Sequence, residues 1–228
     1  MQPQGAAGQD TKQILTLPRR VEGLNCKRQQ ILSISCGLKH TAVITFCPKT
    51  QLNQLICFGG NQYGQCGNGE HGRGKLKTNF DANIHLKGKS IQIVECGGAH
   101  TILKSLSNEV YSFGLNDKGQ LGLGLVGNFS SIPHKLQRFT SFPVVKISCS
   151  DESSSLLSSN GDLYVWGRNT EGMFDGEHGM FALDEPISKP TLIKGPKIQN
   201  MSLGPKSLIL QRQQSGQVFM QGGLLAGI

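Results

Sequence analysis

Short hydrophobic runs separated by turn residues make up most of this chain. Residues 31–36 (ILSISC) alternate between apolar and polar side chains towards their end, which is typical of a strand with one buried face. Residues 41–45 (TAVIT) are rich in β-branched side chains, and residues 55–58 (LICF) form a third run that ends at Gly59. The pattern predicts β-strands joined by short turns.

The same pattern recurs four times at a nearly constant period. One register joins Cys36, Cys96, Cys149 and Leu203, which are 60, 53 and 54 residues apart. A second register joins glycines and a third joins asparagines that each have a glycine three residues later; the members are Gly59, Gly114, Gly167, Gly222, Asn61, Asn116 and Asn169. Agreement between three registers indicates a copied structural unit.

A fourth short strand precedes each copy and begins near a proline, at Pro18, Pro133 and Pro190. A unit of about 50 residues with about four antiparallel strands is typical of a propeller blade. We therefore predict an all-β fold, a partial (open or incomplete) β-propeller of about four four-stranded antiparallel blades. The predicted parts are a disordered tail at 1–12 and copies at approximately 13–69, 70–124, 125–176 and 177–228.

Three stretches resemble a known repeat. Residues 36–41 (CGLKHT), 96–101 (CGGAHT) and 116–122 (NDKGQLG) are similar to the repeat of the regulator of chromosome condensation family. The resemblance covers residues 13–223 and implies a β-propeller, which in that family usually has seven blades. This chain holds three full copies and most of a fourth.

An open arc of blades leaves two apolar end faces. Three explanations stay open: the chain is a shortened product of a longer propeller, it self-associates so that two arcs pair, or its tail caps the ends.

The resemblance also indicates candidate partner-binding residues. The founding member of the family exchanges nucleotide on the small GTPase Ran, and residues at the histidine position and just before it face the GTPase. Carried over, these positions are Lys39 and His40, Ala99 and His100, Glu152 and Ser153, and Lys206 and Ser207. An acidic residue before the histidine matters for exchange in the family, and only the third copy has one, Glu152. The alternative for His40 and His100 is a structural role, in which each imidazole hydrogen-bonds neighbouring backbone at a strand start.

Motifs for other chemistry are absent from the sequence. The glycine-rich segment 59–69 recurs between strands, so its glycines are expected to serve backbone turns and blade packing and not to bind phosphate. The sequence contains no C-x-x-C, Walker, G-x-S-x-G or H-E-x-x-H motif. Cys36, Cys96 and Cys149 are expected to be small buried residues. We predict no catalytic residues, no metal and no cofactor.

Basic residues are concentrated in the first half of the chain. The formal net charge is +8, and residues 70–90 contain five basic side chains, Arg73, Lys75, Lys77, Lys87 and Lys89, against Glu70 and Asp81. An extra exposed loop on a repeat scaffold is a common place for binding residues. These five are candidate contacts for an acidic protein surface or, weakly, for nucleic acid; the alternative is a solvated loop.

Composition narrows the class of protein. The chain has 37% hydrophobic and only 17% charged residues, with 30 glycines, which argues against a disordered chain and a coiled coil. It lacks a run of roughly 18 apolar residues and a signal-peptide pattern, so we expect no membrane span and a cytoplasmic location, with the nucleus as the alternative.

We interpret the chain as a non-enzymatic module for protein–protein interaction and regulation, because repeat arrays present stacked loops and catalytic motifs are missing. The alternative function is guanine-nucleotide exchange on a Ran-like or other small GTPase.

Overall fold

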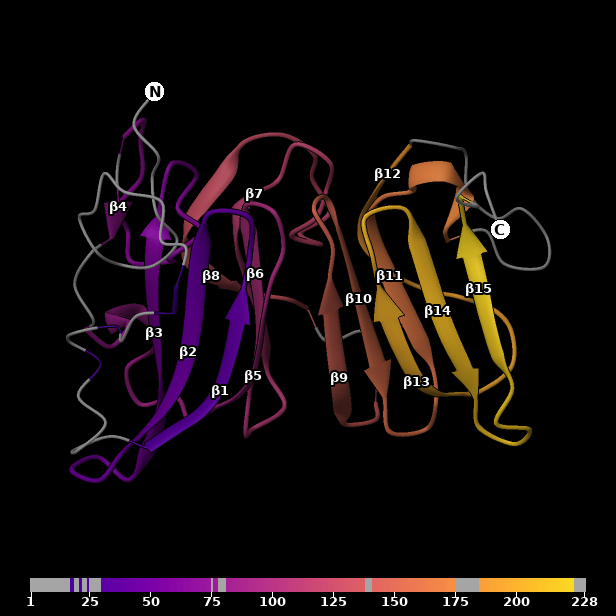
Figure 1. Cartoon of the computed structure of the whole chain (residues 1–228), viewed down its shortest axis with the longest axis horizontal. Coiled ribbons are helices and arrows are strands. Elements are labelled where there is room, and N and C mark those ends of the chain that lie inside the picture. The colour runs from indigo at the N-terminus through magenta and orange to yellow at the C-terminus, as the bar shows by residue number, and fades with distance from the viewer. Residues whose placement is uncertain are drawn as a thin grey trace. The chain divides into compact units, whose positions relative to one another are not determined.

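The computed structural model describes residues 17–18, 21, 24, 30–74, 76–77, 81–137, 141–174 and 185–223. The chain forms two compact units, Met1–Leu115 with Phe129–Lys135, and Asn116–Asn128 with Leu136–Ile228. Each holds two antiparallel sheets (Figure 1). The described elements are β-strands and two short 3-10 helices, η1 (Ile84–Leu86) and η2 (Thr170–Gly172). The all-β prediction is confirmed.

The first unit contains the first two sheets, each with four strands in chain order. The first sheet consists of β1 (Gln30–Cys36), β2 (His40–Cys47), β3 (Leu52–Gly60) and β4 (Leu76–Lys77). The second consists of β5 (Ile91–Cys96), β6 (His100–Ser105), β7 (Val110–Leu115) and β8 (Phe129–Lys135). The three runs predicted from residues 31 to 58 are β1, β2 and β3.

The second unit contains the third and fourth sheets. The third sheet consists of β9 (Val144–Cys149), β10 (Ser153–Ser158), β11 (Leu163–Arg168) and β12 (Pro186–Leu192). The fourth has three strands among the described residues, β13 (Ile198–Leu203), β14 (Ser207–Arg212) and β15 (Val218–Gly222). Four such sheets, three of four strands and one of three, make the fold an incomplete β-propeller.

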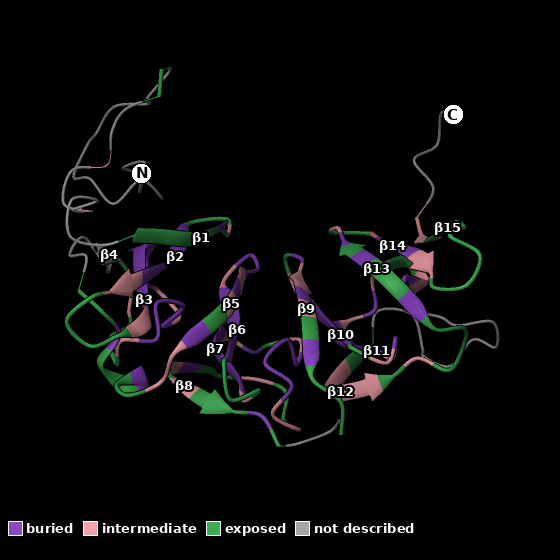
Figure 2. Ribbon diagram, turned by 90° about the horizontal axis from the view of Figure 1, so that it is seen from below, coloured by how far each residue is buried: buried purple, intermediate pink, exposed green. Residues whose placement is uncertain are grey.

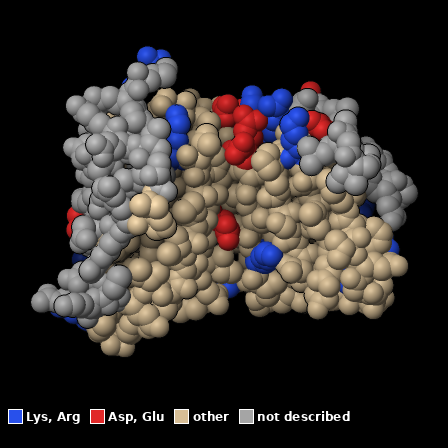
Figure 3. Space-filling view, in the orientation of Figure 1, with Lys and Arg blue, Asp and Glu red and all other residues tan. Residues whose placement is uncertain are grey.

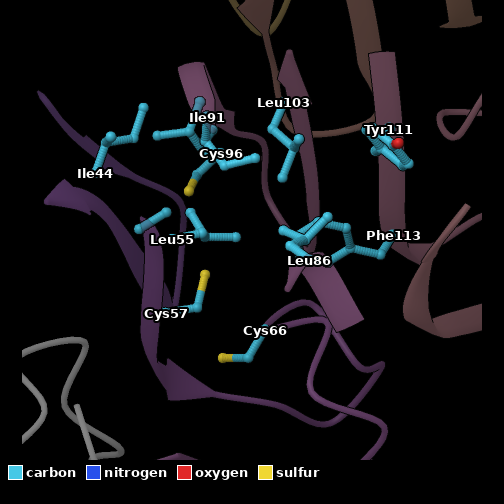
Figure 4. Close-up of a cluster of buried hydrophobic side chains, with 12 residues drawn as sticks. Ile44, Leu55, Cys57, Cys66, Leu86, Ile91, Cys96, Leu103, Tyr111 and Phe113 are labelled. Carbon is cyan, nitrogen blue, oxygen red and sulfur yellow. The ribbon is translucent and has the colours of Figure 1, made fainter. Parts of the chain in front are cut away.

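Each core lies between two neighbouring sheets. In the first unit, side chains from both sheets meet with Cys66 and Leu86 between them (Figure 4). In the second unit, β10 and β11 contribute Leu157 and Val165, and β13 and β14 contribute Met201 and Leu208. The second strand of each of the first three sheets is almost wholly buried, which Figure 2 shows. Such burial on both faces explains why these strands are nearly continuous in small or apolar residues.

The strand with the proline belongs to the preceding copy. We predicted that a strand beginning near Pro133 or Pro190 opens a copy, but β8 and β12 contain these prolines in their interior and pair with β7 and β11 of the copy before. Proline is tolerated there because these are edge strands, where a missing N–H costs no ladder bond. The strand predicted at Pro18–Val21 is not observed at those two residues, and residues 19 and 20 lie outside the described part. The predicted tail at 1–12 also lies outside it.

The repeat-equivalent cysteines do not share one environment. Cys96 is buried because its Sγ lies against the first sheet, 3.5 Å from the Ser35 carbonyl oxygen. Cys36 is exposed and Cys149 is half-buried, so the expectation that all three are buried is wrong. For Cys36 the reason is that most residues of β1 are exposed.

One outer face of the first sheet is partly covered. Val43, Ile56 and Phe58 form a buried cluster on it, and Leu24, from the segment before β1, packs against them.

Candidate functional site

One position in the turn between the first and second strands recurs in every sheet. We call this the rim position, and its residues are Lys39, Ala99, Glu152 and Lys206. The carbonyl oxygen at each rim position accepts a hydrogen bond from the backbone N–H at or just after the end of the third strand; the donors and distances are Gly60 (2.6 Å), Leu115 (2.9 Å), Arg168 (3.0 Å) and Gly223 (3.1 Å). The fold therefore repeats one backbone geometry and varies only the side chain that projects from it.

A glycine at the end of the third strand makes this geometry possible. Gly114, Gly167 and Gly222 have φ of 106°, 95° and 104°, in the region that favours glycine. A Cβ on each would lie 2.4, 2.4 and 2.2 Å from the rim carbonyl oxygen. The glycine register read from the sequence is thus explained by the close approach of the rim turn.

The rim side chains carry different charges. Lys39 and Lys206 are exposed, while the Glu152 carboxylate is paired with the Arg168 guanidinium at 2.9 Å. The Lys206 ammonium lies 2.6 Å from the Glu171 carboxylate. Figure 3 shows acidic and basic side chains gathered towards the upper end of the viewed face and few along the strands.

The histidines follow the rim position and point inwards. His40 and His100 are 0% exposed at the starts of β2 and β6. The Nε2 atom of His40 lies 2.9 Å from the Thr101 hydroxyl, which donates to the Gln65 carbonyl oxygen, also at 2.9 Å. Because the single hydroxyl proton of Thr101 is used there, Nε2 of His40 carries a proton and donates it.

Burial keeps both imidazoles neutral. Desolvation lowers the pKa of His40 to about 4, although a backbone hydrogen bond with His100 raises it. Desolvation, followed by the nearby His40, lowers the pKa of His100 to about 3. These features support the packing interpretation, with one difference: the side-chain partner of His40 is a hydroxyl on the neighbouring sheet. A role of either imidazole in contacting a partner stays a prediction.

In the third copy, serines make the hydrogen bonds at the positions of the histidine and the threonine. Ser153, at the histidine position, donates its hydroxyl to the Arg168 carbonyl oxygen at 2.5 Å. Ser154, equivalent to Thr101, donates to the Gln120 carbonyl oxygen at 2.9 Å, and the Trp166 indole N–H donates to the same oxygen at 2.8 Å. The glutamine carbonyl, at Gln65 or Gln120, is therefore a repeated anchor between a loop and the following sheet.

The glycine-rich loops are closed by the asparagine register. The side-chain oxygen of the asparagine accepts a hydrogen bond from the backbone N–H five residues later, at 3.0 Å for Asn61, 3.0 Å for Asn116 and 2.9 Å for Asn169. Gly64 and Gly119, three residues after the first two asparagines, have φ of 73° and 76°. These loops are held by internal bonds, in agreement with a structural role for their glycines.

The described basic residues of segment 70–90 do not all lie together. Lys77 pairs with Gly59 at the rim end of β3, and Lys89 precedes Ser90, whose hydroxyl accepts the N–H of Asn53 near the start of β3. Gly59 lies six residues after Asn53 along β3, which is about 20 Å at the usual rise per residue. Arg73 and Lys87 are exposed, and Lys75 lies outside the described residues.

Lys89 has a local partner that the sequence did not indicate. Its ammonium lies 2.7 Å from the Glu109 carboxylate, which also accepts from Lys135 at 2.7 Å and from the Tyr111 hydroxyl at 2.8 Å. These bonds, with Lys135 first, lower the pKa of Glu109 to about 2. Only the strand pairing of β7 with β8 brings Lys135 to Glu109, and a single sequence contains no local signal for it.

Within the described residues, no group of three or more His, Cys, Asp or Glu side chains is placed to hold a metal ion. None of the helices described there is long and apolar enough to cross a membrane.

Comparison with family models identifies the repeat. A model of the regulator of chromosome condensation (RCC1) repeat matches residues 107–157, and a second model of the same repeat matches residues 91–120 and 144–172.

Several curated proteins are similar over much of this chain. The X-linked retinitis pigmentosa GTPase regulator of Canis lupus familiaris is 36% identical over 146 residues, which is 64% of this chain and 14% of that protein. The human probable E3 ubiquitin-protein ligase HERC3 is 29% identical over 214 residues, which is 93% of this chain and 19% of that protein. The chain thus spans less than a fifth of the length of either relative.

Solved structures share the fold. Human WBSCR16 matches with a TM-score of 0.71 and 23% identity, over 85% of this chain and 47% of that one. Prp20p of Saccharomyces cerevisiae, described together with its binding to Gsp1p and histones, matches with a TM-score of 0.69 and 22% identity, over 86% of this chain and 46% of that one. The matched repeat models and the recurrent rim geometry agree: residues 91–172 of this chain are similar to the repeat of the regulator of chromosome condensation family.

Proposed function

We propose that this chain is a non-enzymatic protein-recognition module that contacts its partner through the rim positions. The observation that carries the proposal is the repeated clamp on the rim carbonyl, which fixes the backbone and leaves the side chain free to differ between copies. Recognition on a repeat scaffold commonly uses such variable positions on a constant frame.

Charge indicates the kind of partner surface. Two of the four rim residues are exposed lysines, of which Lys206 is paired with Glu171. The single rim carboxylate is paired with Arg168, and the chain carries a formal net charge of +8. An acidic protein surface would be attracted to this arrangement, and the attraction would weaken as salt is added.

A binding measurement with defined probes tests the proposal. The probes are a Ran-type GTPase and purified histones, because the structurally similar Prp20p is described with binding to Gsp1p and histones. We expect one probe to bind and the double variant Lys39→Glu/Lys206→Glu to weaken that binding by about tenfold. Lys49→Glu is the matched control, since Lys49 is exposed in the turn at the opposite end of β2. Equal affinities for the two variants, or no binding of either probe, would refute the proposal.

Nucleotide exchange on a small GTPase is the alternative function. Its support is the name and similarity of the GTPase regulators, of which this chain spans 13 to 14%. The pairing of Glu152 with Arg168 argues against it, because the one acidic rim residue is already neutralised. Release of labelled GDP accelerated by a substoichiometric amount of this chain would favour exchange over simple recognition.

The relatives named as ubiquitin ligases do not change this proposal. HERC3 is named for an activity of a protein of which this chain spans 19%. We propose that the segment shared with it acts in recognition, and we place this chain in the cytoplasm or nucleus.

A further inference from the structure

A cavity of about 300 Å³ lies between the third and fourth sheets, inside the second unit. Its apolar walls include Leu163 from β11, Ile198 from β13 and Leu210 from β14. Among the described residues, its charged lining residues are Lys194 and Arg212. A mostly apolar cavity of this size with a few polar groups is typical of a small-molecule site. It lies at the end of β14 that is farthest from the rim position, because Arg212 is the last residue of that strand.

The first unit shows how the equivalent space is packed. Counted along the cysteine and glycine registers, the three apolar wall residues have equivalents in the first unit, which are Leu55, Ile91 and Leu103. These side chains belong to one buried cluster with Tyr111 and Phe113 (Figure 4). Both aromatic residues come from β7, and they are 8 and 0% exposed. Two buried aromatic rings therefore pack against these walls in the first unit.

The fourth sheet has only one of the two aromatic residues. Phe219 is equivalent to Tyr111 but is 37% exposed, and Gln221 stands at the position of Phe113. Both Phe219 and Gln221 line the cavity. The apolar walls of the second unit thus lack one aromatic ring, and the ring that remains is partly open to solvent.

The hairpin beside the cavity also differs in charge from its equivalents. One backbone hydrogen bond marks the same position in three sheets; the pairs of donor N–H and acceptor carbonyl are Ser105 with Glu109 (2.9 Å), Ser158 with Asp162 (3.0 Å) and Arg212 with Gln217 (2.9 Å). The acceptor residue carries a carboxylate in the second and third sheets. In the fourth sheet it carries a neutral amide, and the donor residue carries a guanidinium. The equivalent pair of the first sheet, Thr45 and Gln54, is uncharged.

The charges around the cavity leave it positive. The carboxylate of Asp162, which precedes Leu163, lies 2.5 Å from the Lys197 ammonium, so this pair is neutral as a whole. Lys194 is exposed and has no ion-pair partner among the described residues. The Arg212 guanidinium lies 4.0 Å from the centroid of the Phe219 ring, a contact that orients it beside the cavity. Two cationic side chains and an apolar recess therefore border the same space.

We propose that this cavity binds a small aromatic carboxylate, with the ring between the apolar walls and the carboxylate beside Arg212 and Lys194. The ring would make the apolar contacts that Phe113 makes in the first unit. The carboxylate would supply the negative charge that the equivalent hairpins have in Glu109 and Asp162. A guanidinium is suited to this role because it can donate two parallel hydrogen bonds to one carboxylate.

The proposed ligand site is independent of recognition at the rim. The rim turn precedes Ser207, the first residue of β14, whereas the cavity lies at Arg212, its last residue. Each proposal can therefore fail without the other.

Titration of the full chain with phenylacetate tests the ligand class. For a probe of this size we expect a Kd on the order of 1 mM. Phenylacetamide has the ring without the charge, and acetate has the charge without the ring, so each should bind at least about tenfold more weakly. The amide NMR signals of Leu210, Arg212 and Phe219 should shift as phenylacetate is added. Equal affinities for phenylacetate and phenylacetamide, or no shift of these three signals, would overturn the proposal.

Two variants test the site itself. Arg212→Gln removes the guanidinium and should weaken phenylacetate binding by at least about tenfold. Lys189→Gln is the control, because it removes one positive charge from an exposed residue of the same unit outside the cavity lining, and it should bind as the wild type does.

Gln221→Phe restores the aromatic residue that the first unit has at Phe113. It should fill the cavity and weaken phenylacetate binding by at least about tenfold, without lowering the melting temperature. If Arg212→Gln melts at a lower temperature than the wild type, Gln221→Phe alone decides the outcome. Wild-type affinity in a folded Arg212→Gln, or in Gln221→Phe, would refute the proposal.

Discussion

The His40 imidazole of the first sheet donates to the Thr101 hydroxyl of the second sheet across 2.9 Å, and both side chains are 0% exposed. The Thr101 hydroxyl in turn donates a hydrogen bond to the Gln65 carbonyl oxygen. One hydroxyl therefore joins a strand start, the next sheet and a glycine-rich loop, in the interior of the first unit.

Removing that hydroxyl should destabilise the first unit. Thr101→Val keeps the side-chain shape but leaves the Nε2–H of His40 and the Gln65 carbonyl without this partner, so we expect a loss of about 2–4 kcal/mol in the free energy of unfolding. Urea denaturation measures it. Thr191→Val is the control, since that hydroxyl bonds the Lys189 carbonyl oxygen at an exposed site, and should cost less than about 1 kcal/mol. Equal losses of unfolding free energy in the two variants would show that the buried hydrogen bonds of Thr101 stabilise the fold no more than an exposed one does.

The rim glycine should tolerate no side chain. Gly167→Ala puts a Cβ 2.4 Å from the Glu152 carbonyl oxygen at a φ of 95°, and we expect a loss of about 3 kcal/mol or more. Gly216→Ala is the control that has backbone strain but no steric clash, because Gly216 has a φ of 66° and its Cβ would meet nothing within 4 Å. It should cost about 1 kcal/mol. Thermal melts compare the two, and a smaller loss for Gly167→Ala would contradict the rim geometry.

Acid should weaken the fold before its carboxylates titrate. The folded-state pKa values of His40 and His100 are lowered from 6.5 to about 4 and about 3. Between pH 6.5 and 5 the unfolded chain therefore binds protons that the folded chain does not, and stability falls as pH falls. Each histidine should contribute a loss of about 2 kcal/mol over this range.

Unfolding free energies measured across that range check the sign and the size. In His100→Gln the slope of stability against pH should be about half that of the wild type, because one of the two buried imidazoles is gone. A slope that is flat, or that rises with acid, would mean that these imidazoles are protonated in the folded chain.

The rim ion pair should matter little for stability. Glu152 and Arg168 are each about a third exposed, with side-chain exposures of 34 and 36%. Glu152→Gln should therefore change the free energy of unfolding, measured by urea denaturation, by less than about 1 kcal/mol. A large loss of unfolding free energy would show that Glu152 is needed for stability. The rim residues could then not be treated as positions that vary for recognition.

The sequence predicted the repeat well because its signals are local. Glycines at positive φ, asparagines that close loops and alternating strands all act within one copy, so Gly167 or Asn116 can be placed from spacing alone. The assignment of the proline-containing strand to the wrong copy has the opposite cause: pairing of β8 with β7 is a tertiary choice, and the spacing of Pro133 fits either neighbour.

The candidate site was predicted less completely for the same reason. The resemblance indicates Lys39 and Glu152 as candidates, which stays a prediction, and no residue type in the sequence reveals the backbone contacts that form the carbonyl clamp. The sequence showed one basic loop, whereas the structure places Lys77 and Lys89 near opposite ends of β3 and ties Lys89 to Glu109. Charge density along a chain does not give its distribution over a sheet.

NMR titration of the imidazole resonances tests the central claim most directly. The claim is that the geometry repeated between the copies serves packing and leaves recognition to the rim side chains. The account predicts that the signals of His40 and His100 remain those of neutral imidazoles down to pH 5, with midpoints near 4 and 3. A midpoint near 6.5 for either residue would show it open to solvent, and would contradict the account.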